Sequence, residues 1–257
     1  MKKDYLKIAI NSVESSGKIL IKYFEKLHDF KQKNENIRDL VTEVDLLSEK
    51  NIKKIIADSF SDHSINGEET GLLKKDSEYC WHIDPIDGTV NYSQGIPLCA
   101  VSVALEYKKK IIIGAIYNPF TGELFFASRG EGAFLNGKEI RVSSKSKFES
   151  GIYVAAFSSN IGRIKTDEYE KFGHINDNSR GVLRLGSAAL SLAYLACGRI
   201  DGFWAKGLFS WDIAAGIILV EEAGGEVSDF FGEDFKLDGK IIIASNAALH
   251  NQLVENL

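Results

Sequence analysis

The stretch Trp81-His82-Ile83-Asp84-Pro85-Ile86-Asp87-Gly88-Thr89 decides how the rest of the chain is interpreted. Pro85 fixes its own φ angle and pushes Asp84 toward an extended conformation, which predicts a strand that ends at Asp84 and turns. Such a turn can direct the Asp84 and Asp87 carboxylates, with the Ile86 carbonyl between them, toward one point. Oxygen ligands of this kind suit a hard cation such as Mg²⁺ rather than zinc, which prefers nitrogen and sulfur.

The two residues after Asp87 extend this interpretation. Gly88 allows a ligand to approach the backbone closely, and the Thr89 hydroxyl can hold a water molecule. We therefore interpret the stretch as a metal-assisted phosphoryl site and the rest of the chain as its support.

Composition limits the class of protein. The chain has 257 residues, enough for one large domain or two closely packed ones, with 44% hydrophobic and 26% charged residues, as in ordinary globular proteins. The net charge of −5 argues against nucleic acid as the main partner, because binding to a phosphate backbone needs a basic face. A phosphorylated small molecule stays compatible with this net charge as a substrate, since bound cations can reverse the sign of the local electric field.

Cysteine usage and hydropathy predict a cytoplasmic protein. Cys80, Cys99 and Cys197 are far apart and form no CxxC pair, which indicates a reducing compartment without a disulfide framework. Residues 1–5 run into mixed polar and apolar sequence without a hydrophobic signal core. No window approaches the ~18 apolar residues that a membrane span requires, so we expect no membrane association.

Apolar spacing predicts two helices and then a sheet in the first half. A three-to-four spacing indicates an amphipathic helix over residues 4–27, and a second helix begins near Thr42, which stands in a T-x-x-D relation to Asp45, and runs to about Phe60. The Asn136-Gly137 pair marks a hairpin within an antiparallel meander. The other expected elements are a turn-like segment over 31–38 and strands over 63–66, 79–83, 101–107, 111–117 and 124–127.

Strands and helices alternate in the second half. The change near residue 150 predicts two subregions: residues 1–150, with a helix pair and an antiparallel sheet that carry most metal ligands, and residues 151–257, which complete the site. The expected elements are strands over 152–157, 182–185, 200–204, near 227 and over 241–243, and helices over 167–172, 188–197, 211–223 and from Asn246.

Acidic residues stand at three separated points, each at a strand end or a helix start: Glu68, the pair Asp84 and Asp87, and Asp212. Each point alone has an ordinary explanation, as solvated loop charge, as a turn, or as an acid favoured at a helix N-terminus. The three points together, in this order, predict carboxylates that converge in space.

With these residues the chain resembles the inositol monophosphatases, which belong to the lithium-sensitive, Mg²⁺-dependent sugar-phosphatase superfamily. The resemblance runs from about residue 4 to the C-terminus. It rests on the stretch 81–92, on Trp211-Asp212-Ile213-Ala214-Ala215-Gly216 with 221–225, and on 39–42 with Asp45, Gly67-Glu68-Glu69 and Arg184-Leu185-Gly186-Ser187-Ala188-Ala189.

This resemblance implies a layered α/β fold, the αβαβα sandwich, usually as a homodimer. It implies two to three Mg²⁺ ions. Glu68, Asp84 and the Ile86 carbonyl would hold the first ion; Asp84, Asp87 and Asp212 would hold the second; Glu68 would assist at a weaker third site.

The resemblance also implies catalytic and substrate-binding roles. Asp45 and Thr89 would orient and deprotonate the attacking water, and Glu68 would share in catalysis through its metal contacts. The backbone N–H groups of Gly88 and Thr89 would receive the phosphate. The remaining substrate contacts would come from Asp87, Gly186, Ser187, Ala188, Ala205 and Asp212.

One position departs from the family pattern. Ala205 stands where inositol-specific members carry a glutamate that binds a substrate hydroxyl, and Lys206, which follows, could meet a second phosphate. We expect a Mg²⁺-dependent phosphomonoesterase acting on inositol 1-phosphate. The alternatives are a phosphatase for fructose 1,6-bisphosphate, another sugar phosphate or a phosphoadenosine nucleotide, and, in another class, a regulatory partner in a bacterial transcription complex.

Overall fold

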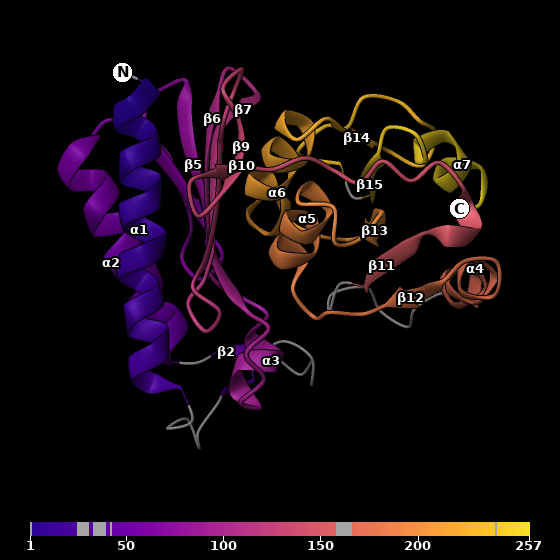
Figure 1. The fold of residues 1–257 in the computed structure, drawn as a ribbon. Coiled ribbons are helices and arrows are strands. Elements are labelled where there is room, and N and C mark those ends of the chain that lie inside the picture. Colours follow the sequence, from indigo (N-terminus) through magenta and orange to yellow (C-terminus); the bar gives the residue numbers. More distant parts are fainter. Residues whose placement is uncertain (1, 25–30, 33–39, 42, 158–165, 240) are drawn as a thin grey trace.

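Five layers follow one another across the computed structural model, which describes residues 2–24, 31–32, 40–41, 43–157, 166–239 and 241–257 (Figure 1). A helix pair covers one face of a first sheet, a second pair lies between that sheet and a second sheet, and a third pair covers the outer face. The pairs are α1 (Lys2–Tyr23) with α2 (Glu43–Ser59), α5 (Ala188–Ala196) with α6 (Ser210–Glu222), and α4 (Thr166–Asp177) with α7 (His250–Glu255). The predicted αβαβα sandwich is confirmed.

The first sheet has eight strands in the order β10-β9-β8-β7-β6-β5-β3-β4. Its pairs are antiparallel except β3 with β5, so the predicted meander is present. The strands are β3 (Ser64–Gly67), β4 (Gly71–Leu73), β5 (Tyr79–Asp87), β6 (Ala100–Tyr107), β7 (Lys110–Asn118), β8 (Glu123–Ser128), β9 (Gly132–Leu135) and β10 (Lys138–Glu139).

The alternation of side chains along β5 places the acidic residues on the inner face of this sheet. Trp81 and Ile83 are fully buried in the hydrophobic cluster beneath α1 and α2. Because successive side chains of a strand point to opposite faces, His82 and Asp84 point toward the layer of α5 and α6. The site thus faces the centre of the sandwich.

The second sheet has five strands in the order β12-β11-β13-β15-β14. β11 pairs in parallel with β12 and β13, whereas β15 is antiparallel to β13 and β14. Helices α5 and α6 are buried on nearly all sides between the two sheets, as expected for helices that are apolar all round. The strands are β11 (Ile152–Phe157), β12 (Gly181–Leu183), β13 (Gly202–Lys206), β14 (Gly225–Ser228) and β15 (Ile241–Asn246).

The structure corrects the predicted end of β5. The strand continues from Asp84 to Asp87 through a bulge, because pairing with β6 resumes where Asp87 lies opposite Ala100. The chain turns only at Gly88, and the short helix α3 (Thr89–Ser93), which was not predicted, follows directly.

The last helix also begins later than predicted. Asn246 ends β15, and its side-chain oxygen accepts a hydrogen bond from the Leu249 N–H (2.9 Å), forming a turn before α7. At the start of the segment predicted as a turn, β1 (Lys31–Gln32) forms a strand and pairs with β2 (Leu40–Val41), which lies after that segment. Residues 25–27, 33–38 and the Thr42 cap lie outside the described residues.

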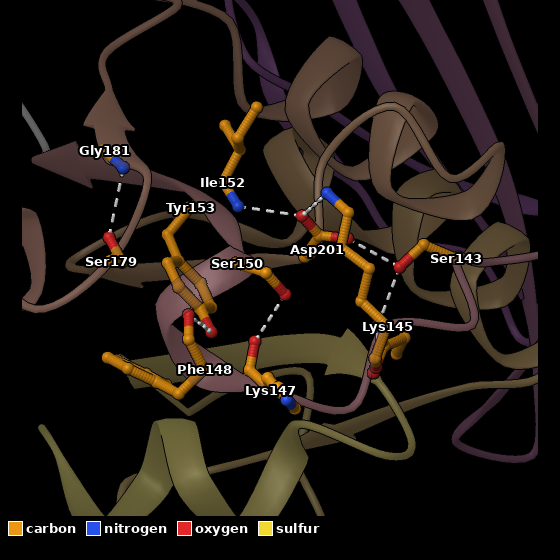
Figure 2. A network of polar contacts seen from close by, with 11 residues as sticks. Ser143, Lys145, Lys147, Phe148, Ser150, Ile152, Tyr153, Ser179, Gly181 and Asp201 are labelled. Carbon is orange, nitrogen blue, oxygen red and sulfur yellow. Dashed lines mark hydrogen bonds and ion pairs between the residues drawn. The ribbon is translucent and has the colours of Figure 1, made fainter.

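A buried carboxylate holds the segment that connects the two sheets against the second sheet. Figure 2 shows that Asp201, which is fully buried, accepts hydrogen bonds from Ser143 Oγ (2.6 Å) and the Ile152 N–H (2.7 Å) and pairs with Lys145 Nζ (2.7 Å). The Asn246 N–H donates to the Asp201 carbonyl (3.2 Å). These contacts hold the segment that enters β11 against the ends of β13 and β15.

We expect Asp201→Ala to lower the free energy of unfolding by about 3 kcal/mol, because the substitution leaves buried donors and a cation without their acceptor. Urea denaturation followed by circular dichroism measures this change. Asp58→Ala, at an exposed position on α2, serves as the control and should change the free energy by less than about 0.5 kcal/mol. A loss no larger than that of the control would contradict the structural role of Asp201.

We expect the buried His250 ring to make a pH-dependent contribution to the stability of the fold. Its ring is buried between Ser245 Oγ (2.9 Å from Nδ1) and Ser228 Oγ (2.8 Å from Nε2), and burial lowers its pKa below 6.5. Below pH 6.5 the unfolded chain therefore binds a proton at His250 more readily than the folded chain does. The contribution of His250 to the free energy of unfolding is lost as the pH falls. In thermal melts the melting temperature of His250→Gln should fall less than that of the wild type between pH 7.5 and 5.5. Parallel pH profiles would contradict this.

Among the described residues, no helix is both long enough and apolar enough to cross a membrane.

Candidate active site

Three carboxylates, two from the stretch 81–92 and one from the stretch 211–216, meet at the inner face of the first sheet. Asp84, Asp87 and Asp212 each contribute one ligand oxygen, and these atoms lie within 4.8 Å of one another. Asp84 and Asp87 belong to β5 and are 2% and 7% exposed, whereas Asp212, in the first turn of α6, is half-buried. The predicted convergence in space is therefore present for these three residues, whereas Glu68, which is also described, does not belong to this group. The assignment of all four acids as metal ligands stays a prediction.

Mutual repulsion makes this cluster unfavourable without a counter-charge. Burial raises the pKa of Asp84 well above 3.8, and the neighbouring carboxylates of Glu68, Asp87, Asp212 and Asp45 raise it further. All five predicted acids therefore lie close enough to interact. Negative charges gathered in this way favour either a proton or a cation among them.

The Asp87 carboxylate is held at the N-terminus of α5. It accepts hydrogen bonds from Ser187 Oγ and from the N–H groups of Ala188 (3.2 Å) and Ala189 (2.7 Å). Burial raises the pKa of Asp87 to about 6, and these hydrogen bonds act in the opposite direction. Ser187 and Ala188, predicted as substrate contacts, are thus engaged with Asp87, and their contact with a substrate stays a prediction.

The turns that carry Gly88 and Gly186 lie against each other. Gly88 has a φ of 100°, and a Cβ there would lie 3.0 Å from the Leu98 carbonyl oxygen and 3.2 Å from that of Gly186. The side-chain amide of Asn91 donates to the carbonyls of Leu98 (2.7 Å) and Leu185 (2.8 Å). Glycine is therefore required at position 88, and Asn91, which the sequence analysis missed, joins the two turns.

The Thr89 hydroxyl lies between two acceptors. Its Oγ1 is 3.0 Å from the Ile86 carbonyl oxygen and 3.3 Å from Oδ1 of Asp45, which is fully buried on α2. The Ile86 N–H in turn donates to Asp84 Oδ1 (3.0 Å). The contact that the catalytic pair Asp45 and Thr89 requires is therefore present, and its role stays a prediction.

Two further polar residues of α2 support the site, and the sequence analysis missed both. Ser48 Oγ donates to the Pro85 carbonyl (3.1 Å), and the Glu49 carboxylate accepts the N–H groups of Glu69–Thr70 (2.7 and 3.2 Å). Both side chains are fully buried. A signal was available, because Ser48 and Glu49 follow Asp45 by three and four positions and so share its buried helix face.

The position that departs from the family pattern lies in the core. Ala205 is fully buried on β13 within the cluster around α5 and α6, so it contributes no polar group to a ligand. Lys206 Nζ lies 3.4 Å from Oε1 of Glu168, which is itself 2% exposed. The expected roles of Ala205 and Lys206 in substrate recognition stay predictions.

The donor set fits a hard divalent cation. Carboxylate and carbonyl oxygens match the ligands that Mg²⁺ takes in proteins. Burial first, and then the neighbouring carboxylates, raise the pKa of Asp84, and a bound cation would favour its charged form. The residues that could hold it are Glu68, Asp84, the Ile86 carbonyl, Asp87 and Asp212.

Comparison with known proteins agrees with this geometry. The model of the inositol monophosphatase family matches residues 1–257. The inositol-1-monophosphatase of Synechocystis is 38% identical over 256 residues, covering 98% of this chain and 88% of that protein. The Nus factor SuhB of Haemophilus influenzae is 38% identical over 250 residues, covering 96% and 94%.

The structure of the inositol monophosphatase from Anabaena superposes with a TM-score of 0.90 at 37% identity, covering 99% of this chain and 95% of that one. The fold, the stretches 81–92 and 211–216 and the sequence similarity all indicate the same family, and the similarity extends over the whole length of the chain. The chain therefore belongs to the inositol monophosphatase family.

Proposed function

We propose that this chain is a Mg²⁺-dependent phosphomonoesterase that hydrolyses inositol 1-phosphate to inositol and phosphate. The observation that carries the proposal is the convergence of Asp84, Asp87 and Asp212 within 4.8 Å. The Thr89–Asp45 contact beside this cluster supports it by supplying a hydroxyl and a base next to the proposed metal site.

The chemistry requires a water molecule to approach a phosphate dianion. Mg²⁺ held by the acidic cluster would neutralise the phosphate oxygens and lower the pKa of a bound water. The N–H groups of Gly88 and Thr89 would bind the phosphate and fix its orientation.

The protein's own residues would move the proton. Thr89 Oγ1 would accept a proton from the attacking water while its own proton passes to Asp45, whose Oδ1 lies 3.3 Å away. The water oxygen would then bond to phosphorus, and the bond between phosphorus and the inositol oxygen would break. The leaving inositol oxygen would take up a proton from a solvent water molecule, and Asp45 would release its proton to solvent.

The substrate is tested by phosphate release from inositol 1-phosphate, fructose 1,6-bisphosphate, phosphoadenosine phosphate and simple sugar phosphates, each with Mg²⁺, EDTA or added Li⁺. The proposal expects the highest kcat/KM with inositol 1-phosphate. A preference for a bisphosphate would instead favour a role for Lys206. Release from none of these substrates would overturn the enzymatic proposal.

A second candidate function is a regulatory partner in a bacterial transcription complex. The name of the Haemophilus relative, a Nus factor, favours it. Affinity capture from bacterial lysate, with and without Mg²⁺, tests it: a stable partner retained without Mg²⁺ would support a regulatory role. Recovery of the chain alone under both conditions would count against it.

We further propose a homodimer in a reducing, cytoplasmic environment. All three cysteines lie in the described ranges and carry free thiols. Light scattering should give about twice the chain mass of 28.4 kDa. A mass of one chain at micromolar concentration would contradict the dimer.

A further inference from the structure

A second polar layer lies beside the acidic cluster. Three polar residues each precede a proposed metal ligand by two positions and therefore belong to the same three elements as these ligands. The pairs are Asn66 with Glu68 after β3, His82 with Asp84 on β5, and Ser210 with Asp212 at the start of α6. The spacing of the metal ligands depends on how these three elements are held together.

The three polar residues are hydrogen-bonded to one another across the fold. Ser210 Oγ lies 2.8 Å from His82 Nδ1 and accepts a hydrogen bond from Asn66 Nδ2 (3.1 Å). His82 Nε2 lies 3.0 Å from Oε2 of Glu106 on β6. His82 and Ser210 are 128 positions apart in the sequence, so this contact joins the first sheet directly to the helix that carries Asp212.

The donors and acceptors of this network are mutually consistent. The hydrogen bond with His82 holds the pKa of Glu106 below its ordinary value, in keeping with the 3.0 Å contact between His82 Nε2 and Glu106 Oε2. Nδ1 of His82 shares one hydrogen with the Ser210 hydroxyl, whose oxygen also accepts a hydrogen bond from Asn66 Nδ2. Ser210 Oγ therefore contacts two partners at once, one on β3 and one on β5.

His82 is the buried member of the network, whereas Asn66, Glu106 and Ser210 are half-buried. His82 is 5% exposed, and the Glu106 side chain is 12% exposed. Ser210 is the first residue of α6, and in the same turn the Asp212 carboxylate accepts the Phe209 N–H (2.7 Å). Fixing Ser210 therefore fixes the first turn of the helix and with it the Asp212 carboxylate.

We propose that Ser210, held by His82 and Asn66, is a positioning residue that sets the place of Asp212 relative to Asp84 and Glu68 and so determines divalent-cation affinity. The inference rests on the proposed function, because it takes the acidic cluster to be a metal site. Residues that orient metal ligands in this way typically contribute about 10- to 100-fold to metal affinity.

The test measures Mn²⁺ binding without substrate, by the electron paramagnetic resonance signal of free Mn²⁺, in the wild type, Ser210→Ala and Ser210→Thr. We expect Ser210→Ala to weaken Mn²⁺ binding about tenfold. Ser210→Thr keeps the hydroxyl, and Ser210 is one of the residues that line a cavity of about 900 Å³. The threonine variant should therefore bind Mn²⁺ as the wild type does.

Two further variants keep the test decisive. Asn66→Ala removes the donor to Ser210 without changing α6 and should weaken Mn²⁺ binding in the same direction. Ser228→Ala is the matched control, because it also removes a hydroxyl that contacts a buried histidine, 2.8 Å from His250 Nε2, but in the second sheet. It should leave Mn²⁺ affinity unchanged. Melts in EDTA verify that each variant is folded.

The outcomes separate the two proposals. A wild-type protein that binds no Mn²⁺ would overturn the proposed function and this inference together. A wild type that binds Mn²⁺, with Ser210→Ala and Asn66→Ala binding it equally tightly, would overturn the positioning role alone. Weakened binding in Ser210→Thr equal to that in Ser210→Ala would also contradict it, because the hydroxyl is the group that the inference invokes.

Discussion

Asp84→Asn should abolish Mg²⁺-dependent phosphate release and at the same time stabilise the metal-free protein. Asp84 is the acid whose pKa is raised by burial and by four neighbouring carboxylates, so its negative charge is unfavourable until a cation binds. Asparagine keeps an oxygen to accept the Ile86 N–H and removes the charge. We expect a loss in kcat of about 10²-fold or more.

Thermal melts of Asp84→Asn and wild type in EDTA measure the second half of this prediction. Removing one of five repelling charges should stabilise the metal-free fold by about 1 kcal/mol, which corresponds to a rise of about 2–4 °C in melting temperature. Adding Mg²⁺ should raise the melting temperature of the wild type more than that of the variant. Near-normal turnover in Asp84→Asn would rule out its assignment as a ligand.

Thr89→Ala should lower kcat by about 10²-fold with little change in KM, because the hydroxyl is proposed to carry the proton of the attacking water to Asp45. The change removes one hydroxyl whose acceptors are the Ile86 carbonyl and the Asp45 carboxylate. Steady-state kinetics with inositol 1-phosphate at saturating Mg²⁺ measures both constants.

Thr89→Ser is the matched control, since it keeps the hydroxyl and removes only a methyl group. It should retain most of the wild-type kcat. A Thr89→Ala variant whose defect lies in KM alone would show that the residue binds substrate and does not orient the water.

Much of the fold and of the candidate site could be predicted from the sequence, because local patterns determine them. Pro85 and the residues before it predicted the strand that carries Asp84, and the spacing of apolar residues predicted α1 and α2. The residues Asp84, Pro85 and Asp87 predicted that two carboxylates face one point. Their convergence with Asp212 was predicted from the position of each acid at a strand end or a helix start, and it is present in the structure.

The remaining features depend on contacts between residues far apart in sequence. Asp87 receives hydrogen bonds from residues about 100 positions later at the start of α5, and His82 meets Ser210 over 128 positions. The strand that carries Asp84 extends beyond Pro85 because β6 offers a partner to Asp87, which local preference cannot show. The buried side chains of Ser48 and Glu49 were not predicted, because the prediction of α2 rested on its apolar residues alone.

The measurement that tests the account most directly is phosphate release from inositol 1-phosphate as a function of Mg²⁺ concentration, starting from protein stripped of metal with EDTA. If the acidic cluster is a catalytic metal site, we expect no release without Mg²⁺, a saturable rise as Mg²⁺ is added, and no such rise in Asp84→Asn or Asp212→Asn. Release that persists in EDTA, or a rise that both variants share with the wild type, would contradict the assignment of the acidic cluster as a catalytic metal site.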